Sequence, residues 1–174
     1  MDNKIDNGKI IMQKEFKIND NDNYESLIRK VESHGSDLVI ETIDNIANNA
    51  KYQQQDESNI SYAPKIQKEM LLINCFENSN TNHNKVRAFS PIPGAFVKIN
   101  DKRLKILKTR KTSIRSLKEN ISKIFINKNK VFIGCNDCLL ELLEVQSEGR
   151  KKMNALSWAR GQIIGSKGVI LNES

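Results

Sequence analysis

The chain has 174 residues, of which 38% are hydrophobic and 28% charged, and its formal net charge is +7. These values are ordinary for a soluble globular protein with one larger domain or two small ones. The sequence contains no run of about 18 apolar residues, which excludes a transmembrane helix. The N-terminus lacks the pattern of a signal peptide, and three cysteines do not make a disulfide framework, so we expect a cytoplasmic protein.

Positive charge is concentrated in the second half of the chain. Residues 1–84 hold 9 Lys/Arg and 14 Asp/Glu, a net charge of −5, whereas residues 85–174 hold 19 Lys/Arg and 7 Asp/Glu, a net charge of +12. A general enrichment in lysine would be uniform along the chain. The asymmetry therefore indicates two parts with different roles, the basic one facing a polyanion such as a nucleic acid.

Residues 1–49 are predicted to form one strand followed by two helices. Residues 10–18 are compatible with a strand. After the polar run at 19–23, helical spacing of apolar residues predicts a helix that stops at Gly35, and Ser36 can cap a second helix. A lone strand leaves both of its edges unpaired. This segment is therefore interpreted as the end of a larger α/β domain.

Residues 50–84 are interpreted as a linker, because they are mostly polar and contain a proline at position 64. Within them, residues 70–73 form a short apolar run. The polar stretch that follows, residues 77–89, is predicted to be a loop that leads into a helix.

Residues 85–174 are predicted to fold as an OB-like β-barrel, which makes the whole chain α+β. Residues 101–108 alternate between apolar and basic side chains, residues 123–134 indicate a hairpin with its turn at 127–130, and residues 138–146 indicate another strand. Residues 154–161 predict a short helix with Asn154 as its cap. Several short strands around a small core are typical of a barrel that binds nucleic acid.

Basic side chains mark a candidate nucleic-acid surface on this barrel. Arg103 and Lys105 are expected to face away from Leu104 and Ile106. The candidate nucleic-acid contacts in this set are Lys102, Arg103, Lys105, Lys108, Arg110, Lys111, Lys151 and Lys152, with Lys65 and Lys68 placed where the linker could line a groove. The alternative is a solvated strand face whose lysines prevent edge pairing.

Two further motifs have local structural interpretations. Pro91, Pro93 and Gly94 predict a stiff joint between a helix and the barrel, since proline fixes φ and glycine permits unusual backbone angles. The segment 135–138, Cys-Asn-Asp-Cys, has no second pair of cysteines to complete a zinc site and is predicted to be a hairpin turn. Trp158 is expected in the core rather than on a base-stacking surface.

Four segments in the same order resemble the C-terminal region of methionyl-tRNA formyltransferases: "YAPKI" at 62–66, "RAFSPIPGAF" at 87–96, "KRLKILK" at 102–108 and "EVQSEGRKKMNALSWARG" at 144–161. The first residues also resemble the end of that family's Rossmann-like catalytic domain, whose Asp-x-Gly turn is matched by Asp6 and Gly8. Departures occur at Ile92, where the family has tryptophan, and at Asn74-Cys75, where it tends to have Asp-Trp.

The resemblance implies transfer of a formyl group from 10-formyltetrahydrofolate to the α-amine of methionine on initiator tRNA, with no metal and no membrane. It makes Asp6 the candidate catalytic residue, and it makes Arg87 either a structural salt-bridge residue or a tRNA contact. The family's other catalytic residues are an Asn and a His in a His-Pro-Ser motif, which this sequence lacks. Neither His34 nor His83 has that context.

We therefore expect the C-terminal half of the enzyme, starting just before the last catalytic residue. Such a chain would bind tRNA but be inactive alone, and a separately encoded N-terminal half is a possible partner. The alternative is a non-catalytic RNA-binding module.

Overall fold

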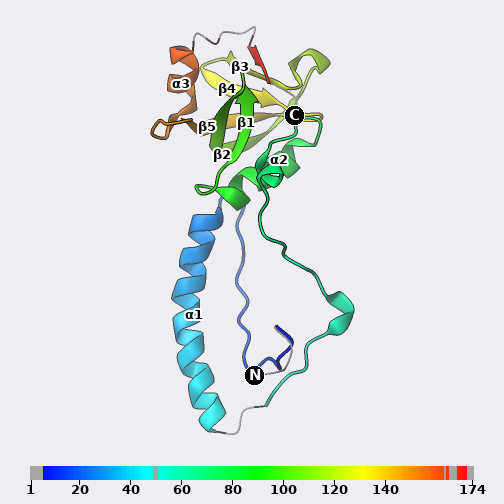
Figure 1. Cartoon of the computed structure of the whole chain (residues 1–174), viewed down its shortest axis with the longest axis vertical. Coiled ribbons are helices and arrows are strands. Elements are labelled where there is room, and N and C mark those ends of the chain that lie inside the picture. The colour runs from blue at the N-terminus through cyan, green and yellow to red at the C-terminus, as the bar shows by residue number, and fades with distance from the viewer. Residues whose placement is uncertain (1–5, 49–50, 163, 165–167, 172–174) are drawn as a thin grey trace. The chain divides into compact units, whose positions relative to one another are not determined.

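The computed structural model describes residues 6–48, 51–162, 164 and 168–171. It divides into two compact units, residues 1–66 and residues 67–174 (Figure 1). The division falls inside the stretch predicted to be a linker. No helix in the described part of the chain is both long enough and apolar enough to cross a membrane.

The first unit is built around one long helix, α1 (Tyr24–Ala47), with a one-turn 3-10 helix at Glu57–Asn59 further along. Asn23 caps α1: its side chain accepts a hydrogen bond from the amide of Ser26, whose hydroxyl in turn accepts one from the amide of Asn23. The prediction of two helices is wrong, because α1 continues through Gly35. The Ser36 hydroxyl donates back to the carbonyl of Glu32 at 2.9 Å instead of capping a new helix.

The predicted strand at 10–18 is also wrong. Only Ile10 forms a β-bridge, with Gln53, and the other residues of the segment have no partner strand among the described residues. The segment instead lies along α1. The Phe16 ring packs on His34 with 5.7 Å between ring centroids, and the Asn45 amide donates to the Met12 sulfur. A strand is stable only when another strand accepts its hydrogen bonds.

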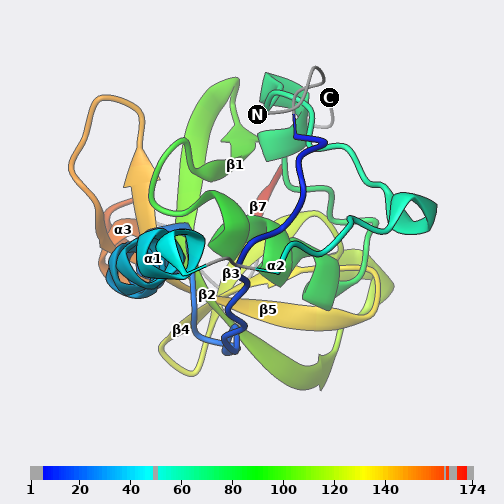
Figure 2. The same cartoon turned by 90° about the horizontal axis from the view of Figure 1, so that it is seen from below.

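The second unit is a nearly closed antiparallel β-barrel with helices packed on it, so the fold class is mixed α and β (Figure 2). In the part of this unit that the structure describes, the strands are β1 (Ala95–Ile99), β2 (Lys102–Arg115), β3 (Lys123–Asn127), β4 (Lys130–Gly134), β5 (Cys138–Ser147), β6 (Met153–Asn154) and β7 (Val169–Ile170). They are ordered β1-β2-β5-β4-β3-β7, with β6 on β5. The helices are α2 (Ser79–Phe89) and α3 (Ala155–Gly161), with 3-10 helices at Lys68–Leu71 and Lys118–Asn120.

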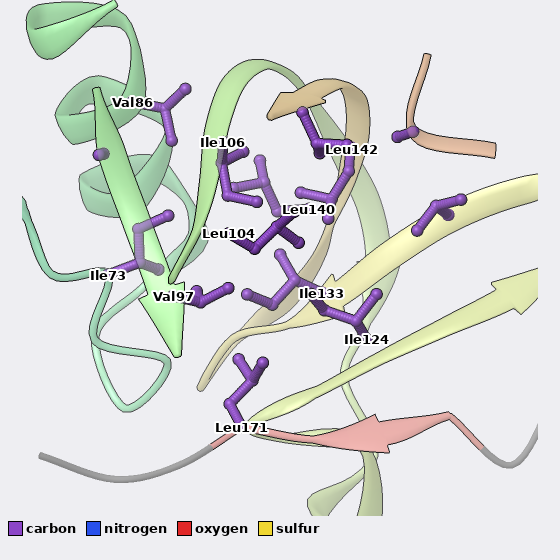
Figure 3. Close-up of a cluster of buried hydrophobic side chains, with 14 of the residues drawn as sticks. Ile73, Val86, Val97, Leu104, Ile106, Ile124, Ile133, Leu140, Leu142 and Leu171 are labelled. Atoms are coloured by element: carbon purple, nitrogen blue, oxygen red, sulfur yellow. The ribbon is translucent and has the colours of Figure 1, made fainter. Parts of the chain in front are cut away.

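Apolar side chains from the strands fill the barrel. Ile106, Ile124, Ile133 and Leu140 are fully buried and point toward one another (Figure 3). Trp158 of α3 joins this core at 6% exposure, which confirms its predicted place. The hairpin, the strand at 138–146, and the helix capped by Asn154 are confirmed as well, because each depends on local pattern and turn chemistry.

The joint between α2 and β1 is held against β2. The Ser90 hydroxyl donates to the carbonyl of Leu107 at 2.7 Å, and the peptide bonds before Pro91 and Pro93 are both cis. Gly94 has φ +87°, and a Cβ there would lie 3.3 Å from the Pro91 carbonyl oxygen. The unusual backbone angle predicted for this glycine is therefore confirmed.

Candidate nucleic-acid interface

A groove of about 880 Å³ lies on the barrel between the β1–β2 turn, the β5–β6 connection and α3. Basic side chains line it from two different segments: Lys102 and Arg103 from the start of β2, and residues 150–152 from the β5–β6 connection. Glu148 is the one acidic side chain among the described residues that line it. The arrangement suits a polyanion.

The β1–β2 turn fixes one side of the groove. Asn100 and Asp101 both have positive φ, 48° and 60°, which is the backbone conformation of a tight hairpin turn and one that Asn and Asp tolerate well. The turn delivers Lys102 and Arg103 directly to the groove. The Arg103 guanidinium lies over the Phe96 ring, 5.2 Å from its centroid, so a cation–π contact orients this side chain.

Hydrogen bonds within the β5–β6 connection fix the other side. The Arg150 amide donates to the Ser147 carbonyl at 3.0 Å, and the Gln146 side chain donates to the Arg150 carbonyl at 2.8 Å. Lys152 is paired with Glu144 at 3.4 Å. Arg150 was missed by the sequence interpretation, although it directly precedes the two lysines that were chosen.

The remaining predicted basic residues of β2, Lys105, Lys108, Arg110 and Lys111, lie elsewhere on the strand. The β2–β5 register shifts between Ile106 and Lys108, which changes the face that each later residue presents. Lys105 is paired in register with Phe96 and Gln146 and does not line the groove, and Lys108 lies opposite Glu144.

Farther along β2, two more predicted residues contact other elements of the barrel. Arg110 lies 3.4 Å from the buried carboxylate of Glu141, which Lys130 also approaches at 3.5 Å. The Lys111 ammonium contacts the Asn80 side chain of α2 at 3.5 Å. The structure therefore divides the predicted basic residues of β2 among different surroundings instead of presenting them as one surface.

Three predicted contacts lie outside the groove. Lys65 belongs to the first unit, and Lys68 begins a 3-10 helix of the second. Arg87 is in the last turn of α2, where its Nε donates to the Asn84 side chain at 3.0 Å. RNA contact by these residues stays a prediction.

Asp6 lies in a turn of the first unit at φ +59°. The Gln55 side chain donates to the carbonyls of Asp6 and Gly8 at 2.9 and 2.6 Å, which ties the turn to a segment 49 residues away in sequence. The Asp6 side chain is exposed. Of the two histidines, His34 packs on Phe16, and His83 is buried with its Nδ1 2.8 Å from the Thr109 hydroxyl.

The Cys-Asn-Asp-Cys segment forms the predicted turn between β4 and β5, with the Cys135 amide donating to the Cys138 carbonyl. Burial raises the pKa of the Cys135 thiol to about 12 and that of Cys75 to about 11, so both are poor nucleophiles near neutral pH. Among the described residues, no three His, Cys, Asp or Glu side chains gather as metal ligands.

Asp137 gives this turn a structural role. Its carboxylate accepts hydrogen bonds from the Ser79 amide at 2.6 Å and the Ser79 hydroxyl at 3.1 Å, at the N-terminus of α2. Burial tends to raise the pKa of Asp137, but the Ser79 amide and further hydrogen bonds outweigh burial and lower it below its ordinary value of 3.8.

Comparison with known proteins supports the resemblance of the four segments to formyltransferases. Residues 65–162 match the family model described as "Formyl transferase, C-terminal domain". The methionyl-tRNA formyltransferase of Syntrophomonas wolfei is 33% identical over 175 residues, covering 96% of this chain and 56% of that protein. The chain spans about half the length of the curated relatives it matches.

Solved structures agree in fold. HypX from Aquifex aeolicus in complex with tetrahydrofolic acid has a TM-score of 0.65 at 18% identity, covering 91% of this chain and 28% of that one. An N-formyltransferase from Helicobacter canadensis in complex with folinic acid and dTDP-3-aminofucose has a TM-score of 0.61 at 26% identity, covering 85% and 53%. The chain belongs to the formyltransferase family, carries its C-terminal domain, and is homologous to the C-terminal part of methionyl-tRNA formyltransferase.

Proposed function

We propose that this chain is the tRNA-binding part of a methionyl-tRNA formyltransferase, the enzyme of translation initiation that formylates methionine on initiator tRNA. The observation that carries the proposal is the basic groove, which lies in the unit that holds residues 67–162 of the family match. Lysine and arginine neutralise phosphates, and this binding is independent of sequence and sensitive to salt. A cytoplasmic location is part of the proposal.

The reaction assigns a role to Asp6. A neutral amine attacks the formyl carbon of 10-formyltetrahydrofolate, and the oxyanion that develops needs hydrogen-bond donors. The family supplies these from an Asn and a His, and a carboxylate such as that of Asp6 orients the His or relays a proton. The turn that holds Asp6 is tied by Gln55, which supports a defined position for the carboxylate. Asp6 alone does not complete the site, because residues that act as a unit lose function together.

In the family, an N-terminal half holds the rest of the catalytic set and the donor site. We propose that residues 1–49 are the end of its Rossmann-like formyltransferase domain and that the barrel is OB-like. The apolar side of α1 supports this: α1 has no buried residue, although it is 24 residues long. Its exposed apolar side chains are Tyr24, Ile28, Val31, Val39, Ile40, Ile43 and Ile46. An amphipathic helix normally buries such a face.

The first test is binding of methionyl initiator tRNA to the full chain across a salt titration. We expect affinity to fall steeply as salt rises. The second test adds the N-terminal half of a related methionyl-tRNA formyltransferase with 10-formyltetrahydrofolate and assays formylated methionyl-tRNA. Activity that appears on mixing and is lost in Asp6→Asn supports the enzyme proposal.

The basic groove also supports a second candidate, a non-catalytic RNA-binding module. Binding of tRNA together with no formylation on mixing would support the module and overturn the enzyme proposal. A folded chain that does not bind tRNA at low salt would overturn both.

A further inference from the structure

A second cavity, of about 410 Å³, lies on the barrel and shares no described lining residue with the basic groove. The strand order begins with β1 and ends with β7, so these strands form the two edges of the sheet. Val97 and Lys98 line the cavity from β1, and Ser122 and Leu171 line it from beside β3 and β7. Residues 69–77 supply another wall. Small-molecule sites have this size and often lie at the mouths of β-barrels.

The wall formed by residues 69–77 carries a carboxylate oxygen without a hydrogen-bond donor. The Oε2 atom of Glu77 is buried, and no described group donates a hydrogen bond to it. The Lys85 ammonium lies 3.7 Å from this oxygen and donates instead to the Leu72 carbonyl at 2.9 Å. Exposed Glu69 adds a second negative charge to the same wall. A buried acceptor without a donor is unfavourable, and a bound molecule with an N–H group would supply the missing donor.

Backbone hydrogen bonds fix the position of Glu77. Its amide donates to the Asn74 carbonyl at 3.0 Å, and its carbonyl accepts from the Asn136 amide at 3.2 Å. The Phe76 amide donates to the Asn74 side chain at 3.0 Å. The carboxylate therefore stands on backbone that is already ordered, so that binding costs little additional conformational entropy.

Lys98 gives the cavity a cation of its own. This side chain of β1 is half-buried, and it makes no ion pair within the described part of the chain. A lysine ammonium has three N–H donors and forms its strongest hydrogen bonds with anionic oxygens such as those of a carboxylate. The cavity thus combines an acceptor that lacks a donor with a cation that lacks an anion.

The rest of the lining is largely apolar. Its buried apolar side chains include Ile73, Val97 and Leu171, which Figure 3 labels. Phe76 adds an aromatic ring that is 57% exposed. Cys75 also lines the cavity, but burial raises the pKa of its thiol to about 11, so this thiol is not a nucleophile at neutral pH. The lining suits reversible binding of a molecule with an apolar part.

We propose that this cavity binds a small zwitterion of the α-amino-acid class with an apolar side chain. The ammonium group of the ligand donates to Glu77 Oε2, its carboxylate accepts from the Lys98 ammonium, and its side chain packs on the apolar lining. A molecule with only one of the two charges would leave either Glu77 or Lys98 without a partner. The inference goes beyond the proposed function and does not depend on RNA binding.

The test is a titration of the full chain at pH 7, followed by amide NMR, with free leucine and two analogues. N-acetylleucine lacks the ammonium group, and leucinamide lacks the carboxylate. We expect leucine to cause saturable shifts at residues 69–77 and 97–98. Each analogue should bind at least about tenfold more weakly, because each loses one charged hydrogen bond.

Two variants assign the contacts to single residues. Glu77→Gln and Lys98→Met should each weaken leucine binding by at least about tenfold. Glu77→Gln should not weaken N-acetylleucine further, and Lys98→Met should not weaken leucinamide further, since each analogue already lacks the group concerned. Matched controls are Glu119→Gln and Lys118→Met in the 3-10 helix at Lys118–Asn120, because neither residue lines the cavity. These controls should leave leucine affinity nearly unchanged.

The outcomes decide this inference separately from the proposed function. Loss of affinity confined to the cavity variants and the two analogues supports it. Absence of saturable shifts up to about 10 mM leucine, analogues that bind as tightly as leucine, or equal loss in the controls overturns it. The comparison of the three ligands needs only the wild type, so it decides the question even where a variant fails to fold. Binding of tRNA by the same sample tests the proposed function whichever result is found.

Discussion

Helix α1 and strand β5 show two different ways in which this chain holds secondary structure. All 24 residues of α1 remain at least partly exposed, whereas five of the ten residues of β5 are buried. The helix is stabilised by local contacts, including the Asn23–Ser26 capping pair and an Arg29–Glu25 ion pair. Such contacts contribute only a few tenths to about 1 kcal/mol each. The barrel, in contrast, is stabilised mainly by burial of its core side chains.

The close approach of the backbone at Gly134 should give the largest effect. A Cβ at this position would lie 1.9 Å from the Asn120 carbonyl oxygen, where the 3-10 helix at Lys118–Asn120 crosses the end of β4. Gly134→Ala should therefore destabilise the barrel by about 3 kcal/mol or more. Thermal unfolding followed by circular dichroism measures this. Gly161→Ala is the control, because no atom lies within 4 Å of a Cβ there. Equal melting temperatures for the two variants would contradict the close approach of the Asn120 carbonyl to Gly134.

The contact between Asp137 and α2 should have an intermediate effect. Asp137→Ala removes the acceptors of the Ser79 amide and hydroxyl, so it should cost about 1 kcal/mol at pH 7. Because the pKa of Asp137 is lowered in the fold, its contribution is complete above its ordinary value of 3.8 and is lost as pH falls through the lower folded value. Urea unfolding should show the wild type and the variant converging in stability below about pH 4.

A neighbouring variant controls for general effects on the same turn. Asn136→Ala should leave stability nearly unchanged at both pH values, since the hydrogen bond of Asn136 to Glu77 uses its backbone amide. A difference between the wild type and Asp137→Ala that persists undiminished at low pH would argue against a role for the charged carboxylate.

A substitution in the middle of α1 is expected to have the smallest effect on the stability of the barrel. Gly35 is helical, and no atom lies within 4 Å of the place that a Cβ would take there, so Gly35→Ala should stabilise the helix locally by about 1 kcal/mol. Hydrogen exchange should show slower exchange of α1 amides and unchanged exchange in β4 and β5. A shift of the same size in the barrel strands would show that the two regions unfold together.

The contrast between the two regions also separates successful predictions from failed ones. The hairpin at 123–134 was predictable because Lys128 and Asn129 occupy a two-residue turn between alternating segments, and both have positive φ in the structure. Residues 10–18 have a similar strand pattern but no strand to pair with among the described residues. Ser36 can donate backward to Glu32 or act as a cap, and sequence alone does not distinguish these hydrogen bonds.

The sequence by itself determined the barrel's alternating strands, its capped helix, the excess of positive charge and the resemblance to formyltransferases, because these depend on local patterns and motifs. Only the tertiary structure decided which cations act together. The β2–β5 register pairs Leu104 with Ser147, and so brings Lys102 and Arg103 beside the connection that carries Arg150 and Lys151. The other basic residues of β2, Lys105, Lys108, Arg110 and Lys111, lie farther along the strand and do not line the groove. Register is set by long-range pairing and core packing, which no local pattern contains.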